Sequence, residues 1–194
     1  MRVFTLSRLL TCAVAWAGVA VAAQAGDGPW RFDFGPAAHG YEKVSPDAAF
    51  TREAGYGFEP GAALHRVIRN RHALRGGFVT GDSPFLFSVA VPEGDYRVTI
   101  TVGDAAGVSE TTVKAESRRL MLEHVTTRKG EFATRSFVVN VRNAQLLPPP
   151  PTAPGGARVR LNDREQGSYT WDDKLTLAFS GRAPKLDAVT IERV

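Results

Sequence analysis

The segment 85–104 constrains the fold of this chain more strongly than any other. On each side of a break at residues 92–95, apolar side chains occupy every second position. These alternating residues are Phe85, Phe87, Val89 and Val91, then Tyr96, Val98, Ile100 and Val102. A period of two places such residues on one face of a strand, and Pro, Gly and Asp in the break are typical turn residues. We therefore predict an antiparallel hairpin with one dry face, as in a β-sandwich.

Short alternating segments recur along the rest of the chain. They predict further strands over residues 30–35, 108–117, 119–125, 132–142, 157–161, 174–180 and 186–194. The alternation places Leu120 and Leu122 inward, and Asp33 and Glu116 outward. Arginines crowd residues 62–74, where we expect a loop or a single turn. About ten short strands, separated by turn signals and with hardly a helix, predict an all-β antiparallel jelly-roll sandwich.

Residues 1–25 have the features of a secretory leader. Two arginines precede an apolar run over residues 9–23, which ends in an A-x-A cleavage pattern. The run is shorter than the roughly 20 residues that a membrane-spanning helix needs. We predict cleavage near Ala25, a single mature domain over residues 26–194, no membrane span, and a secreted or periplasmic location.

Cleavage would remove the one cysteine, Cys12, so the mature chain would have no disulfide and no thiolate chemistry. It would also remove two arginines and lower the formal net charge from +4 to +2. A balance so near neutral, without a clustered basic face, argues against nucleic-acid binding. The proline-rich segment 146–156 has four consecutive prolines, which cannot enter a sheet interior. We interpret it as an exposed loop within the one domain.

The tripeptide Gly81-Asp82-Ser83 matches the one that carries the nucleophile of SGNH or GDSL esterases. In those enzymes the serine opens a helix, whereas Pro84 and a predicted strand follow Ser83 here. The Asp-x-x-His that usually supplies the base does not occur in this sequence. Because a serine without a base is inert, we expect a polar turn and assign no catalytic residue.

Two aspartates are candidates for a structural metal site. Asp33 in the first predicted strand and Asp187 in the last would approach each other if these strands pair. Oxygen ligands suit calcium in a secreted protein without disulfides. A salt bridge to Arg31 or Arg193 is the simpler use of the same carboxylates.

Aromatic and planar polar side chains occur in or beside glycine-rich loops. Aromatic faces bind the C–H surfaces of sugars, and Arg and Asp make paired hydrogen bonds to hydroxyls. The candidate glycan-binding residues are Tyr56, Phe58, Arg118, Arg119, Trp171 and Asp172. The alternative is that the aromatic residues close the ends of the sandwich and bind no ligand.

Several blocks of sequence together resemble a known module. They are WRFDFG (30–35), GYGFEPG (55–61), PFLFSVAVPEGDYRVTITVGD (84–104), TTVKAESRRLMLE (111–123), FVVNVR (137–142) and WDDKLTLAFSG (171–181). The module is the N-terminal galactose-binding-like β-sandwich of bacterial rhamnogalacturonan acetylesterase-like proteins of the SGNH group. The resemblance runs from about residue 30 to residue 194 and implies a jelly roll associated with the breakdown of pectin-type polysaccharide.

In that family an SGNH hydrolase domain usually follows the sandwich, and its catalytic residues have no matching positions here. We therefore expect a secreted, non-catalytic carbohydrate-binding or accessory module that acts beside an SGNH esterase domain on plant cell-wall polysaccharide. A purely structural domain of a split or truncated esterase, without glycan affinity, is the alternative. Calcium is the one cofactor that the sequence suggests.

Overall fold

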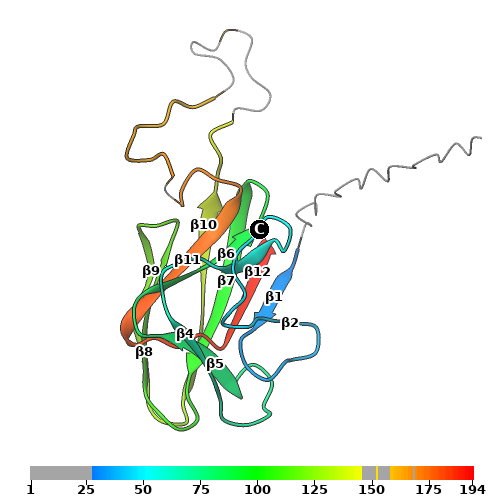
Figure 1. Cartoon of the computed structure of the whole chain (residues 1–194), viewed down its shortest axis with the longest axis vertical. Coiled ribbons are helices and arrows are strands. Elements are labelled where there is room, and N and C mark those ends of the chain that lie inside the picture. The colour runs from blue at the N-terminus through cyan, green and yellow to red at the C-terminus, as the bar shows by residue number, and fades with distance from the viewer. Residues whose placement is uncertain (1–27, 146–151, 153–157, 168) are drawn as a thin grey trace, which may run out of the picture.

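The computed structural model describes residues 28–145, 152, 158–167 and 169–194. The regular elements of these residues are all β-strands (Figure 1). They are β1 (Trp30–Asp33), β2 (Glu42–Lys43), β3 (Tyr56–Phe58), β4 (Leu64–Ile68), β5 (Gly77–Gly81), β6 (Phe85–Ala90), β7 (Gly94–Gly103), β8 (Ser109–Ala115), β9 (Arg119–Thr127), β10 (Phe132–Val141), β11 (Lys174–Ala183) and β12 (Ala188–Arg193). The predicted leader and most of the proline-rich segment lie outside the described residues.

Ten of these strands form two five-stranded sheets, and β4 and β5 pair separately. One sheet has the order β10-β7-β12-β1-β2 and the other the order β3-β6-β11-β8-β9. Strands far apart in the chain lie side by side: Trp30 of β1 is opposite Ile191 of β12. This arrangement confirms the predicted all-β jelly-roll sandwich.

The predicted hairpin over residues 85–104 is wrong in its pairing. Both strands form, but β6 pairs with β3 and β11, whereas β7 pairs with β10 and β12 in the other sheet. In the link between them, Val91 is 1% exposed and the Tyr96 hydroxyl donates to the Pro92 carbonyl at 2.6 Å. The chain crosses the end of the sandwich because the apolar faces of β6 and β7 can then pack against each other.

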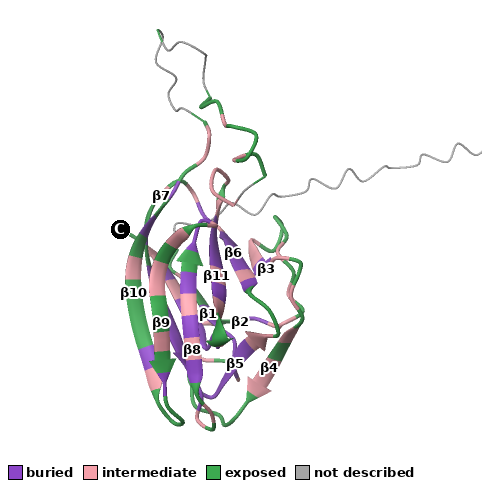
Figure 2. Ribbon diagram, turned by 90° about the vertical axis from the view of Figure 1, so that its left-hand side faces the viewer, coloured by how far each residue is buried: buried purple, intermediate pink, exposed green. Residues whose placement is uncertain are grey.

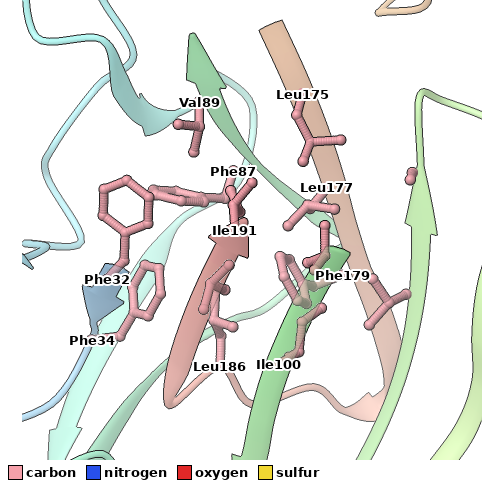
Figure 3. Packing of buried hydrophobic residues seen from close by; sticks show 14 of the residues in the cluster. Phe32, Phe34, Phe87, Val89, Ile100, Leu175, Leu177, Phe179, Leu186 and Ile191 are labelled. Atoms are coloured by element: carbon pink, nitrogen blue, oxygen red, sulfur yellow. The ribbon is translucent and has the colours of Figure 1, made fainter. Parts of the chain in front are cut away.

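The core lies between the two sheets (Figure 3). Phe87 of β6, Ile100 of β7 and Ile191 of β12 belong to one buried cluster. The Phe87 ring contacts the rings of Phe32 and Phe34, each with a centroid distance of 5.1 Å. Burying one such side chain contributes roughly 1.5–3 kcal/mol, so this cluster fixes the positions of both sheets.

Burial follows the predicted alternation within strands and departs from it at their ends. In Figure 2 β8 is largely buried, whereas the edge strand β10 is largely exposed. Asp33 and Glu116, predicted to point outward, are both 0% exposed. Asp33 turns back to accept the Gly35 amide at 2.7 Å, and Glu116 follows β8 with a φ of 51°, outside the strand's alternation.

Three further predictions about strands were wrong. The described part of the predicted strand 157–161 forms only an isolated bridge, from Arg158 to Gln145. Leu120, expected to point inward, is 50% exposed because the register of β8 and β9 shifts near Val113. Residues 64–68, expected to lie in a loop or turn, form β4 because they pair with β5, a long-range contact that local arginine content does not reveal. Among the described residues there is no helix long and apolar enough to cross a membrane.

Candidate functional site

A cavity of about 430 Å³ lies at the end of the sandwich where β8 joins β9. Three segments contribute to it: the β8–β9 turn, the residue after β10 and the segment that leads into β11. The cavity is lined by Glu116, Ser117, Arg118, Arg119, Arg142, Arg164, Glu165, Thr170 and Trp171. Its volume is in the range of roughly 300–1,000 Å³ that is usual for small-molecule sites.

The β8–β9 turn is short and strained. Ala115 pairs with Arg119, so residues 116–118 make the whole connection. Glu116 and Ser117 have φ values of 51° and 63°, although neither is a glycine. Each such residue in the left-handed region costs on the order of 1–3 kcal/mol. Two backbone hydrogen bonds hold the turn, from the Glu116 amide to the Thr176 carbonyl and from the Arg118 amide to the Glu116 carbonyl.

The turn places the Glu116 side chain in the cavity wall with little solvent access. One carboxyl oxygen accepts the Thr176 amide at 3.2 Å, and the other, Oε2, has no hydrogen-bond partner among the described residues. Burial raises the pKa of Glu116 to about 7, and the Asp172 carboxylate acts in the same direction. The Thr176 amide, Arg119 and Arg142 oppose this rise. Glu116 therefore titrates near neutral pH.

Four arginines line the same cavity, and two of them, Arg119 and Arg142, are charged neighbours of Glu116. Arg119 donates to the Asn140 carbonyl at 2.8 Å, and the Arg142 guanidinium lies over the Trp171 ring, 4.6 Å from its centroid. Arg118 and Arg164 are exposed, and within the described part of the chain neither guanidinium is held by an ion pair or a hydrogen bond. Two of the four cations are thus positioned by protein groups and two face the solvent.

The segment before β11 is anchored to the sheet beneath it through Lys174. Its ammonium group pairs with Glu59 and lies 4.5 Å from the Phe50 ring centroid and 4.8 Å from that of Tyr169. Asp172, two residues earlier, has a buried Oδ1 without a hydrogen-bond partner among the described residues. Burial raises the pKa of Asp172 to about 6, against the opposing charge of Lys174.

The structure brings together half of the residues that the sequence analysis selected. Arg118, Arg119 and Trp171 line the cavity, and Asp172 directly follows Trp171. Tyr56 lies on β3, where its hydroxyl donates to Glu42.

Phe58 is 4% exposed in the core, where its ring packs against those of Phe34, Phe85 and Phe87. We therefore remove Phe58 from the candidate set, because a ligand in solution has no access to it.

The other main components of the cavity are not evident from the sequence. Glu116 was assigned to the wet face of a strand, although the Glu-Ser-Arg sequence after the strand marks a turn. Arg142 was placed at the end of a strand, and Arg164 lies in a stretch without any periodic pattern. No local signal indicates that these segments meet, since their proximity depends on the pairing of β8 with β11 and β9.

The opposite end of the sandwich also buries carboxylates. Asp104, which is 1% exposed, accepts hydrogen bonds from Arg69 Nε at 2.9 Å and Nη2 at 3.0 Å, and from Lys185 Nζ at 2.7 Å. Burial alone would raise the pKa of Asp104, but these hydrogen bonds outweigh it and hold the pKa well below its usual range. This end contains a compact, paired cluster of buried charges.

The two predicted calcium ligands lie at this same end. Asp33 Oδ2 and both carboxyl oxygens of Asp187 are buried and have no hydrogen-bond partner among the described residues. Burial raises the pKa of Asp187 to about 9, and the charges of Asp104 and Asp33 add to the rise, whereas the nearby Gly103 amide and the Lys185 charge oppose it. These orphaned oxygens suit a cation, and equally a protonated Asp187. In the described residues no three His, Cys, Asp or Glu side chains are grouped to hold a metal ion.

The fold and the cavity at one end of it define a galactose-binding-like β-sandwich. Residues 30–147 match the model of the family described as Beta-agarase/YXIM esterase-like, galactose-binding domain-like. Since this match covers more than half of the chain, the chain belongs to that family. The predicted resemblance to the galactose-binding-like module of an esterase-type protein is therefore confirmed. No curated protein sequence matches the chain.

Several solved structures are similar at low sequence identity. The protein YxiM from Bacillus subtilis is 22% identical with a TM-score of 0.58, and the match covers 86% of this chain and 40% of that one. β-Glucuronidase 2 of Bacteroides uniformis is 11% identical (TM-score 0.46; 79% of this chain, 15% of that one). A family 35 carbohydrate-binding module from Clostridium thermocellum is 8% identical (TM-score 0.38; 69% and 92%). The first likeness shows a shared fold, over two fifths of the length of YxiM.

Proposed function

We propose that this chain is a non-catalytic carbohydrate-binding module and that the cavity between the β8–β9 turn and the segment leading into β11 is its glycan site. The observation that carries the proposal is the composition of the cavity. An aromatic ring, Trp171, and four guanidinium groups line one volume large enough for a sugar. Guanidinium groups form paired hydrogen bonds to sugar oxygens, and aromatic faces cover C–H surfaces.

The finer proposal joins this site to the breakdown of plant cell walls. We expect a pectin-type polysaccharide as the ligand and an SGNH esterase domain as the catalytic partner. A secreted or periplasmic location, after cleavage near Ala25, would bring the module to such a polymer. The family's description as esterase-like supports the partner.

Calorimetry with purified protein and oligosaccharides of rhamnogalacturonan, galactan and galacturonan tests this function. We expect binding to at least one of them at millimolar ligand, lost in Trp171→Ala and Arg119→Ala variants that retain the thermal unfolding midpoint of the original protein. Absence of binding to all three would favour the alternative, a structural domain that only covers an esterase surface. Phe58→Leu is not informative here, because Phe58 is a core residue.

A structural calcium ion between Asp33 and Asp187 is a separate proposal. It is supported by the unpartnered oxygens of these two buried carboxylates. Oxygen ligands of this kind are what calcium prefers, and the ion would replace the proton that Asp187, with a pKa of about 9, otherwise holds at neutral pH.

A further inference from the structure

The charge of the cavity wall is strongly one-sided. Four arginines face two glutamates, Glu116 and Glu165. Glu116 titrates near neutral pH, so it supplies less than a full negative charge there. A concave site lined by one sign of charge concentrates ions of the opposite sign. The wall is therefore suited to an anionic ligand.

The exposed polar groups of the wall are mostly hydrogen-bond donors. Arg118 and Arg164 present guanidinium groups that, within the described residues, no carboxylate neutralises. Arg142 is fixed against the Trp171 ring at 4.6 Å. A neutral sugar has hydroxyls that need acceptors as well as donors, whereas a carboxylate accepts paired hydrogen bonds from a guanidinium. This balance favours an acidic sugar over a neutral one.

The backbone conformation that places Glu116 in the cavity wall is strained. Glu116 and the following Ser117 are both in the left-handed region, where glycine would be unstrained. The result is a fully buried carboxyl group in the wall, with Oε2 lacking a partner among the described residues. Strain of this kind is often retained where a side chain is needed at a fixed place in a site.

The groups that face Glu116 come from every neighbouring segment. The Thr176 amide of β11 donates to it, and its charged neighbours are Arg119 at the start of β9, Arg142 after β10 and Asp172 before β11. As pH rises through neutrality, ionised Glu116 would repel an anion in the cavity. In its protonated form Glu116 carries no charge and no longer repels that anion.

We propose that the cavity binds an acidic sugar residue whose carboxylate lies among Arg118, Arg142 and Arg164, and that Glu116 favours this ligand by taking up a proton. This inference rests on the proposed glycan-binding function and specifies the class of sugar. The proton comes from the solvent and stays on the Glu116 carboxyl group. No covalent bond of the ligand changes.

The test is calorimetry with trigalacturonate, with galactotriose as the neutral probe and with a sulfated galactotriose as the second anion. At about pH 6 we expect trigalacturonate to bind at least tenfold more tightly than galactotriose. Arg118→Gln and Arg164→Gln should each weaken it about three- to tenfold, in line with the loss of one charge-assisted contact. Arg128→Gln is the matched control, since Arg128 is exposed at the opposite end of β9.

Each outcome separates the inference from the function on which it rests. If galactotriose binds as tightly as trigalacturonate, the inference is overturned and the proposed function still stands. Failure of all three probes would overturn the inference, and failure of the rhamnogalacturonan oligosaccharides as well would remove the proposed function. Equal affinity for sulfated galactotriose and for trigalacturonate would contradict the proposal that the arginines recognise a carboxylate.

The role of Glu116 has its own readout. Between about pH 6 and pH 8 we expect trigalacturonate affinity to fall about three- to tenfold, because the anion and ionised Glu116 repel each other. Glu116→Gln, which keeps an oxygen for the Thr176 amide, should leave only the shallower pH dependence that Asp172, with a pKa of about 6, contributes at the acid end of this interval. If that variant does not fold, titrations of the original protein in two buffers of different ionisation enthalpy at about pH 7 decide the question. Zero proton uptake on binding would contradict the role, as would a pH dependence unchanged in Glu116→Gln.

Discussion

Asp104 and Glu116 are buried carboxyl groups on either side of β8 in the chain, at opposite ends of the sandwich. Asp104 accepts hydrogen bonds from Arg69, Lys185 and the Ala106 amide. Glu116 accepts the Thr176 amide, and its Oε2 has no partner among the described residues, although two arginines are its charged neighbours. Both ends therefore combine acids with cations, but the cations at the Asp104 end are directed at the acid.

This difference in pairing indicates that the buried charges have different roles at the two ends. At the Asp104 end, attraction between groups of the protein offsets the cost of burial, and the product is a fixed structure. At the Glu116 end, two arginines remain exposed and the acid keeps an unused oxygen. We infer that interactions left unmade within the protein at that end are available to a ligand.

The largest expected effect comes from removing the acid at the paired end. Asp104→Asn leaves Lys185, whose side chain is 11% exposed, without its charge partner. Loss of one member of a buried pair costs about 3–5 kcal/mol. Urea denaturation at neutral pH measures this, with the exposed Asp47→Asn as the control. A loss below about 1 kcal/mol would mean that the two ends do not differ in the way described.

Asp187→Asn should have a smaller effect of opposite sign. The raised pKa of Asp187, about 9, means that the folded state holds a proton that the unfolded state releases above the ordinary aspartate range. Stability is therefore lost as pH rises from about 4 towards 9. Asparagine removes this penalty, so we expect the free energy of unfolding at about pH 8 to increase by about 1–3 kcal/mol, with little change at about pH 4.

The same variant tests the calcium proposal. If calcium bridges Asp33 and Asp187, calcium should raise the unfolding midpoint of the original protein, a chelator should reverse the rise, and Asp187→Asn should abolish it. An identical midpoint with calcium and with chelator would show that protonation of Asp187 is sufficient.

Glu116→Gln should be mildly stabilising, with a gain that grows as pH rises from the ordinary glutamate pKa of 4.5 to about 7. The pKa of Glu116 is raised to about 7, so its stability contribution is complete below the ordinary glutamate range and is lost as pH rises to about 7. We expect a gain of about 1–2 kcal/mol at about pH 8 that disappears near pH 4. Urea midpoints at both values measure it, and a pH-independent difference would indicate a packing effect instead of a proton.

Arg142→Gln should have the smallest effect. It removes the guanidinium that lies 4.6 Å from the Trp171 ring centroid, an exposed cation–π contact worth about 0.5–1 kcal/mol. The emission of Trp171 should shift, while that of the control Arg128→Gln should not. An unchanged spectrum would mean that Arg142 and Trp171 do not form a fixed pair in solution.

For the central strands β6 and β7, the sequence was sufficient to predict their positions and buried faces but not their partners. Alternation from Phe85 to Val91 and from Tyr96 to Val102 correctly identified which side chains are buried. The same alternation is compatible with a hairpin within one sheet or with a crossing between two sheets. A pattern of faces carries no information about which strand lies beside which, so the pairing of β6 with β11 was inaccessible to it.

The candidate site was found in part for a related reason. Arg118, Arg119 and Trp171 were selected by residue type and loop position, and the fold brings them together. Phe58 met the same criteria but is a core residue. It lies on the edge strand β3, and its ring points inward between the sheets. Glu116 was missed because its backbone leaves the strand conformation at that residue, and sequence alternation assumes that conformation.

The position of β12 has a consequence for how the domain is formed. This strand is the last of the sandwich in chain order, yet it lies between β7 and β1 in the middle of its sheet. A nascent chain lacking Ala188–Arg193 would expose the ladder edges of both neighbours, and unpaired edges promote aggregation. Folding of the sheet must therefore wait for the last strand to be synthesised, and its long-range pairings predict a slow rate.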